Sequence, residues 1–243
     1  MFIRSRSVIA SLSIVAVCAC IAMASGVGAK DAPDLTVNQI LDRYVQAVGG
    51  EEAVNNITSR VCMGKVTTDL TERQNPVYES ALFRISAKTT GKHLFEELVD
   101  GPSASSGCDG KIHWKADQCG IMSSDEGNLK LEFLTDPHGP LRVHDYFAGL
   151  THKGAYEING KTTYRLEPSH LKPEYYTLYF DVESGLLVAI GYHWYVEDYR
   201  EVDGVLFPFK IAAGRKGGST IYQFESVKNN VPLEDGIFKI PSR

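Results

Sequence analysis

The strongest constraint on the fold is a change in hydrophobic period near Ser59. Before this residue, apolar side chains recur at helical spacing; after it, they alternate with polar ones in short runs separated by turn residues. Alternation with a period of two is typical of strands that bury one face. The sequence therefore predicts a mostly β domain of the α+β class, with strands at residues 61–68, 78–87, 94–99, 111–116, 175–180, 187–194 and 205–211.

Several dipeptides predict where the strands are connected. Asn159-Gly160 and Asp203-Gly204 each supply two residues that tolerate a positive φ, as a two-residue hairpin loop requires. Thr90-Gly91 and Asp109-Gly110 lie at or beside further connections. Pro208 interrupts the last predicted strand, and because proline cannot donate a ladder hydrogen bond it predicts a sheet edge or a bulge.

An amphipathic helix is predicted ahead of the sheet. Thr36 and Gln39 form a capping box at its start, and Gly49-Gly50 ends it because glycine adopts the left-handed C-terminal conformation without strain. A second short helix is predicted at residues 51–57. The first helix is expected to face the sheet, because one wide apolar stripe runs along it: Val37, Ile40, Leu41, Tyr44, Val45 and Val48.

The strand pattern fails between residues 125 and 149. Leu129, Phe133 and Leu134 lie at helical spacing there, before Asp136-Pro137 breaks the run. We therefore expect one or two short helices inserted in the sheet. Because no repeat or second linker is visible, we expect residues 30–243 to form a single domain.

The N-terminus has the pattern of a cleavable signal peptide. Arg4 and Arg6 precede an uncharged apolar stretch at residues 8–24. Serine and alanine dilute this stretch too much for a transmembrane anchor. We expect cleavage after Ala29, so that residues 1–29 are removed and the mature chain is exported. The alternative is a membrane-anchored lipoprotein acylated at Cys20.

Charge and cysteine content narrow the class of partner. Loss of residues 1–29 removes two of the 25 basic residues and none of the 30 acidic ones, so the net charge falls from −5 to −7. We therefore expect no nucleic-acid partner. The mature chain has an odd number of cysteines, Cys62, Cys108 and Cys119, which precludes a complete disulfide framework. A Cys108–Cys119 bridge would need a tight return of the chain, and buried free thiols are the alternative.

The sequence carries no common catalytic, cofactor or metal-binding motif. Its seven histidines never occur at the i+2 or i+4 spacing that places two on one metal ion. The glycine-rich residues 214–219 lack the ending and the following helix of a phosphate-binding loop, and they predict a hairpin turn. Asp145 beside His144, and the pair Glu96 and Glu97, are explained best as surface positions. We therefore expect a protein that is not an enzyme and holds neither cofactor nor metal.

Large apolar side chains are numerous enough to line a deep concave face. A closely packed core is the alternative for each of them, and a ligand site requires that the helices fill this face incompletely. We call this concave face the apolar cup. We place Trp114 in or beside it, because the strand of Trp114 alternates Ile112, Trp114 and Ala116 with polar residues. The candidate ligand-binding residues are Leu41, Tyr44, Met63, Phe83, Ile85, Leu98, Trp114, Phe133, Leu178, Phe180, Leu187, Phe207 and Phe209.

Four segments follow one another along the chain, and their succession is a more specific family signature than any one of them alone. They are residues 44–53, residues 107–110 before Trp114, residues 179–187 and residues 198–209. In this order they resemble the outer membrane lipoprotein-sorting protein family, and the resemblance covers residues 35–241. It implies the fold of the periplasmic lipoprotein carrier. That fold is an incomplete, strongly curved antiparallel barrel, here of about 10–11 strands, with an N-terminal helix and short inserted helices over its concave face.

The same resemblance implies a function. It indicates a monomeric, non-enzymatic periplasmic protein that binds or carries lipids or the acyl chains of lipoproteins in an apolar cup. An alternative on the same fold is an envelope-stress sensor or protein-interaction module with a membrane-associated protein partner. A hydrolase is a third possibility, and it would need a polar cluster with perturbed pKa values inside the cup.

Overall fold

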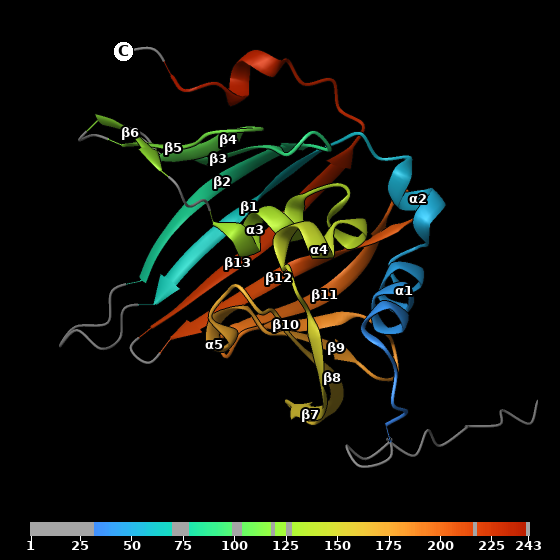
Figure 1. The fold of residues 1–243 in the computed structure, drawn as a ribbon. Coiled ribbons are helices and arrows are strands. Elements are labelled where there is room, and N and C mark those ends of the chain that lie inside the picture. Colours follow the sequence, from blue (N-terminus) through green and yellow to red (C-terminus); the bar gives the residue numbers. More distant parts are fainter. Residues whose placement is uncertain are drawn as a thin grey trace, which may run out of the picture.

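Except for β6 and β7, consecutive strands pair as antiparallel neighbours, and the last strand returns to pair with the first. In the computed structural model, which describes residues 32–69, 78–98, 104–117, 120–124, 128–215 and 218–241, thirteen strands form one sheet. Its order is β6-β5-β4-β3-β2-β1-β13-β12-β11-β10-β9-β8-β7, so β1 and β13 meet inside the sheet and β6 and β7 are its edges (Figure 1). The strands are β1 (Ser59–Asp69), β2 (Tyr78–Lys88), β3 (Lys92–Leu98), β4 (Ser105–Asp109), β5 (His113–Asp117), β6 (Gly120–Ser124), β7 (Thr151–Ile158), β8 (Lys161–Glu167), β9 (Leu178–Asp181), β10 (Leu187–Ile190), β11 (Trp194–Val202), β12 (Val205–Arg215) and β13 (Gly218–Asn229).

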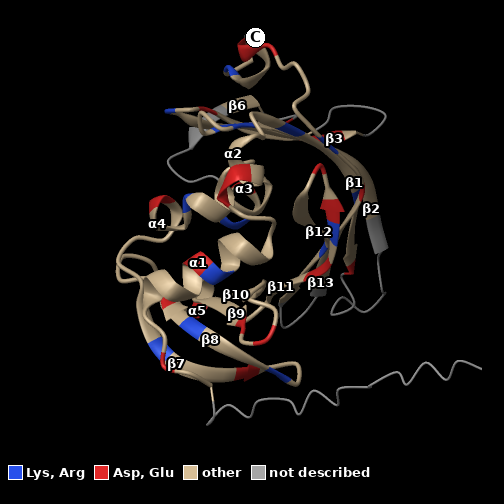
Figure 2. Ribbon diagram, turned by 90° about the vertical axis from the view of Figure 1, so that its right-hand side faces the viewer, with Lys and Arg blue, Asp and Glu red and all other residues tan. Residues whose placement is uncertain are grey.

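The sheet is strongly curved, and its two edge strands do not pair with each other. Figure 2 shows it wrapping around α1 (Val37–Ala47), α3 (Leu129–Thr135) and α4 (Val143–Tyr146), which lie on its concave side. The remaining short helices are α2 (Glu51–Asn55), η1 (Gly139–Leu141), α5 (Pro173–Tyr176) and η2 (Asp235–Phe238). The predicted α+β class, with a curved open sheet and helices over its concave face, is confirmed.

The N-terminal helix begins and ends where its caps predict. The Gln39 backbone N–H donates to Thr36 Oγ1 (3.3 Å), and the Thr36 N–H donates to Gln39 Oε1 (2.9 Å). After the helix, Gly49 has a φ of 128°. A Cβ at this position would collide with the carbonyl oxygen of Gly204 in the β11–β12 turn. Glycine is therefore required where the end of α1 meets the sheet.

Both two-residue hairpin turns are confirmed. Asn159 and Gly160 have φ values of 48° and 76°, and Asp203 and Gly204 have values of 52° and 81°. No bulge occurs at Pro208, because the register of β11 with β12 does not shift there, but the alternative prediction of an edge position is confirmed locally. Proline is tolerated because β12 pairs with β13 only from Lys210 onward, so Pro208 has a strand neighbour on one side only.

The number and limits of the strands differ from the prediction. There are thirteen in the described residues rather than the 10–11 that the resemblance implied. β13, which is twelve residues long, was given no predicted range, and neither were β4 and β6. Their sequences, Ser-Ser-Gly-Cys-Asp and Gly-Ile-Met-Ser-Ser, lack hydrophobic alternation. Residues 175–180 are not one strand, because α5 extends to Tyr176 before β9 begins. Residues 187–194 also divide, into β10 and the start of β11.

The insert between β6 and β7 is helical, as predicted, and consists of α3, η1 and α4. Cys62 and Cys108 are buried free thiols. Cys119, the predicted signal peptide and Cys20 lie outside the described residues.

Candidate ligand-binding site

The concave face is built from alternate residues of the central strands. Cys62 pairs with Ile85 and Gly64 with Phe83 across β1 and β2, so all four point to the same side. A Cβ on Gly64 would collide with the carbonyl oxygen of Gln223 and lie 2.9 Å from the Phe83 ring. The missing side chain lets the Phe83 ring lie across β1.

Most of the predicted ligand-binding residues meet in one buried cluster on this face. The rings of Tyr44 in α1 and Phe180 in β9 lie 5.2 Å apart, and those of Phe133 in α3 and Phe147 lie 5.0 Å apart edge to face. The candidates in this cluster are 0–8% exposed, so the helices close the central part of the cup. It contains ten of the thirteen candidates, Leu41, Tyr44, Phe83, Ile85, Phe133, Leu178, Phe180, Leu187, Phe207 and Phe209, whose role in binding stays a prediction.

The other three candidates do not lie on the concave face. Met63 (44% exposed) points away from it, because its neighbours in β1 point inward. Leu98 (40% exposed) lies at the exposed end of β3. Trp114 belongs to a separate cluster under η2, on the convex side, and its Nε1–H donates to the carbonyl oxygen of Phe238 (3.0 Å). The placement of these residues in the cup was wrong. The apolar face of β5, with Trp114 and Ala116, points to the convex side, and β1 and β3 carry apolar side chains on both faces, which composition does not distinguish.

A buried carboxylate holds the inserted helices together. Asp136 accepts hydrogen bonds from the His138 N–H (2.8 Å), from Arg142 Nη1 (2.9 Å) and from the Tyr146 hydroxyl (2.9 Å). Burial raises the pKa of Asp136, and these three partners oppose the rise. Arg142 also pairs with Asp145 at 2.9 Å. The side chain of Asp136 therefore stabilises the arrangement of the short helices in residues 129–146, which we call the helical insert.

Polar contacts attach the helical insert to the sheet. Burial lowers the pKa of His93 in β3 to about 4, so its ring is neutral at pH 7. Its Nε2 lies 3.2 Å from Thr135 Oγ1, and the Thr135 hydroxyl donates to the Leu131 carbonyl (2.7 Å), so Nε2–H is the donor to Thr135. His113 in β5 contacts Glu132 at 3.1 Å. Both contacts hold α3 against the sheet.

Beyond the helices, part of the concave face remains uncovered. A cavity of about 430 Å³ lies there, near the ends of β1, β2 and β13 that point away from α1 and α2 (Figure 1). We call this cavity the mouth. Its lining consists of Val66, Thr68, Ser80, Ala81, Phe95, Glu97, Thr220 and Tyr222.

Aromatic rings connect the mouth to the closed core. Phe83 stacks on Phe95 (5.9 Å) and meets Tyr222 edge to face (5.9 Å), and Tyr222 stacks on Trp194 (6.1 Å). Phe83 also meets Phe224 of the core at 5.3 Å. Phe95, Tyr222 and Trp194 were not among the predicted ligand-binding residues. Their positions in alternating strands were a signal, but the extent of the helical cover decides which rings remain accessible.

A second groove, of about 550 Å³, lies on the seam between α1 and the helical insert. Leu41, Asp42 and Val45 line it from α1, and Leu141 and His144 line it from the opposite side. The cover of the cup therefore consists of two parts that meet along a partly open seam.

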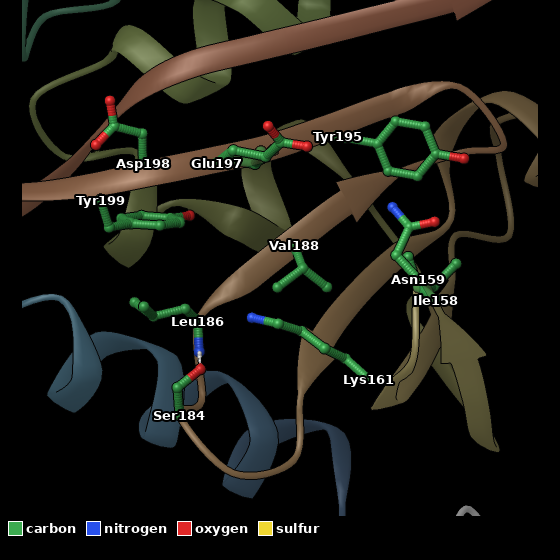
Figure 3. A pocket seen from close by; sticks show the side chains of 11 residues that line it. Ile158, Asn159, Lys161, Ser184, Leu186, Val188, Tyr195, Glu197, Asp198 and Tyr199 are labelled. Atoms are coloured by element: carbon green, nitrogen blue, oxygen red, sulfur yellow. Dashed lines mark hydrogen bonds between the residues drawn. The ribbon is translucent and has the colours of Figure 1, made fainter.

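A third cavity, of about 450 Å³, opens where β10 and β11 diverge (Figure 3). The side chains of Tyr195 and Glu197, which line it, point to the face of β11 opposite to that of Trp194, so the cavity opens on the convex side. Its charged side chains have partners: Glu197 pairs with Lys210 (2.8 Å), Asp198 with Arg200 (2.6 Å) and Lys161 with Asp181 (3.7 Å). It contains none of the predicted candidates and offers a ligand no unpaired charge.

Two further findings concern metals and membranes. Within the described ranges, no group of three or more His, Cys, Asp or Glu side chains is placed to hold a metal ion. No helix in the described part of the chain is both long and apolar enough to span a bilayer.

Comparison with known proteins identifies the architecture. No protein-family model and no curated protein sequence matches the chain. Among solved structures, a DUF1329 family protein from Desulfovibrio piger superposes with a TM-score of 0.59 at 13% identity, covering 85% of this chain and 98% of the other. A LolA superfamily protein from Nitrosomonas europaea gives 0.55 at 12% identity, covering 85% and 98%.

A putative outer membrane lipoprotein-sorting protein domain from Vibrio parahaemolyticus gives a TM-score of 0.54 at 11% identity, covering 87% of this chain and 97% of that domain. These identities are too low to transfer an activity, but the superpositions extend over nearly the whole of each partner. The resemblance seen in the sequence is confirmed at the level of structure: the chain has the fold of the LolA superfamily and of the outer membrane lipoprotein-sorting proteins.

Proposed function

We propose that this protein binds the acyl chains of lipids or lipoproteins in the concave groove of its sheet and carries them through the periplasm without catalysing a reaction. The observation that best supports this function is the mouth, a cavity of about 430 Å³ bordered by aromatic rings and left open by the helices. Sites for small ligands typically measure roughly 300–1,000 Å³. The fold shared with lipoprotein-sorting proteins supports the same class of function.

An acyl chain would enter at the mouth and continue beneath the helical insert. Phe83 borders both regions, since its ring contacts Phe95 in the mouth and Phe224 in the core. Extension beyond Phe83 requires the insert to move, because core side chains fill the groove there. Each methylene removed from water contributes about 0.8 kcal/mol, so burial of ten methylenes would supply about 8 kcal/mol against the helix contacts that are lost.

The proposal includes the predicted maturation. Removal of residues 1–29 would release a monomeric domain, residues 30–243, into the periplasm. The ten concave-face candidates would contact the acyl chain once the helices move. Met63, Leu98 and Trp114 are not part of the proposed site.

Native mass spectrometry of the protein purified from its own cell envelope tests the proposal directly. A co-purifying lipid or lipopeptide identifies the ligand, and dissociation of that mass by lipid extraction is the control. A protein that carries no acyl-containing species, and that takes up none when incubated with envelope lipids, would contradict the function.

A matched pair of variants tests the location of the site. Ala81 faces the mouth, whereas Leu82, next to it in β2, is 52% exposed on the opposite face. We expect Ala81→Phe to obstruct the mouth and weaken binding of dodecanoate, while Leu82→Phe leaves binding unchanged. Equal effects of the two substitutions would exclude the mouth as the point of entry.

A further inference from the structure

A lysine of the helical insert contacts an aromatic ring that stacks on the lining of the mouth. Lys130, in the first turn of α3, is half-buried. Its Nζ lies 5.1 Å from the centre of the Trp194 ring and 5.3 Å from that of Tyr176. Trp194 stacks on Tyr222, which lines the mouth. The ammonium group is therefore held between two aromatic faces beside the uncovered part of the cup.

Among the described residues, this ammonium group has no carboxylate partner. Other partly buried lysines have one: Lys88 and Lys92 both pair with Asp235, at 2.8 and 2.6 Å. None of the ion pairs among the described residues includes Lys130. Burial lowers the pKa of Lys130 to about 8, so the ammonium form still predominates at pH 7. A partly desolvated cation without a counter-ion is costly, and an anion supplied by a ligand would remove that cost.

Two features indicate that the negative charge opposite Lys130 belongs to an amphiphile and not to a free anion. The aromatic faces leave ammonium hydrogens available to donate, because a ring contact uses the charge and not all three donors. The adjoining cavity is bordered by Phe95 and Tyr222, which offer an acyl chain an apolar surface. The carboxylate of Glu97 is also part of the mouth lining and disfavours an anion close to it, so the negative head would lie on the Lys130 side.

We propose that Lys130 binds the head of the ligand and makes the site selective for amphiphiles that end in an anionic group, a carboxylate or a phosphate monoester. This inference rests on the proposed function, since it assigns the head of the same ligand whose acyl chain occupies the groove. A hydrogen bond to a charged partner contributes roughly 1.5–3 kcal/mol, which corresponds to at least about a 10-fold difference in affinity.

Isothermal titration calorimetry at pH 7 tests the proposal on the purified protein. The ligands are dodecanoate, dodecyl phosphate and uncharged dodecanol below their aggregation limits, with acetate and inorganic phosphate as heads without a chain. We expect the two anionic amphiphiles to bind at least about 10-fold more tightly than dodecanol, and acetate and phosphate to bind far more weakly than either amphiphile.

Variants then assign the preference to one side chain. Lys130→Met should lower the affinity for dodecanoate to that for dodecanol, with dodecanol itself unchanged, and Lys130→Arg should keep the preference. Lys65→Met is the matched control, because Lys65 is exposed on the opposite face of β1, next to the mouth residue Val66. Thermal unfolding followed by circular dichroism verifies that each variant is folded.

The outcomes separate the two proposals. If dodecanol and dodecanoate bind equally well to the unmodified protein, or if Lys130→Met keeps the preference for dodecanoate, the acyl-binding function stands and the role of Lys130 is refuted. If inorganic phosphate binds as tightly as dodecyl phosphate, Lys130 belongs to a site for small anions and the inference fails. If no amphiphile binds, the proposed function and the inference both fail.

Discussion

Ile40 and Leu41 are adjacent on α1, and truncating each to alanine measures how open the seam is. Ile40 is 1% exposed and Leu41 is 8% exposed, and both belong to the concave cluster. Only Leu41 lines the groove of about 550 Å³ between α1 and the helical insert. The two substitutions remove the same number of carbon atoms from the same helix. They differ mainly in whether the space left behind is a sealed void or an extension of the groove.

The expected costs follow from burial. Each substitution deletes three carbon atoms, so the transfer contribution is about 2.4 kcal/mol at 0.8 kcal/mol per carbon. Ile40→Ala also leaves a sealed void, which raises its cost to about 4 kcal/mol. The void left by Leu41→Ala merges with the groove and fills with water, so its cost should remain at about 2–3 kcal/mol. Alanine improves helix propensity by only a few tenths of a kcal/mol in either case.

Urea unfolding measures both costs. The free energies of unfolding of the two variants are compared with that of the unmodified protein, and the comparison holds if the m-values are equal. We expect Ile40→Ala to be more destabilising by about 1–2 kcal/mol. If Leu41→Ala costs as much as Ile40→Ala, the seam is closed in solution and the two-part cover is refuted.

Three further predictions each depend on one feature of the structure. The pKa of His93 is lowered on folding, so below pH 6.5 the unfolded chain binds more protons than the folded protein. The free energy of unfolding should therefore drop by roughly 2 kcal/mol between pH 7 and pH 5. Urea unfolding of His93→Gln should show a smaller loss. Trp114→Phe leaves the buried Phe238 carbonyl without its donor and should cost about 1–3 kcal/mol, with dodecanoate affinity unchanged in calorimetry because Trp114 lies on the convex side. Amide hydrogen exchange should be faster in α3 and α4 than in α1; the reverse order would contradict a movable insert.

Local signals in the sequence predicted the elements that depend on local backbone preferences. The capping box at Thr36 and Gln39 and the turn at Asn159-Gly160 were predicted correctly, because side-chain hydrogen bonding and glycine's freedom act within a few residues. β4 was missed because its small polar residues form a strand only between β3 and β5. Residues 175–180 were read as strand because tyrosine favours strands, but Pro173 starts a helical turn there.

The site was less predictable than the fold, because it depends on which face each side chain occupies. A shift of one residue moves a side chain to the other face, and Trp114 shows the consequence. Its strand pairs Trp114 with Gly107, and glycine leaves room for the indole on the convex side. The mouth was unpredictable for another reason: how far the helices extend over β11 and β13 decides whether Trp194 and Tyr222 remain partly exposed, and that limit is a property of the whole fold.

The two parts of the cover are attached by different kinds of contact, and this difference sets the order in which they would move. α1 is tied to the sheet through main-chain carbonyls: the Leu206 N–H donates to the Val48 carbonyl (2.8 Å), and Arg43 donates to the Val182 carbonyl (2.7 Å). α3 is attached to the sheet at the longer side-chain contacts of Thr135 with His93 (3.2 Å) and of Glu132 with His113 (3.1 Å). Contacts made by side chains are lost by rotation about χ angles without any change in the strands, whereas the main-chain hydrogen bond between Leu206 and Val48 is not, so α3 can separate from β3 and β5 while the end of α1 stays in place. A ligand that enters at the mouth meets α3 first, so the weaker attachment lies on its path.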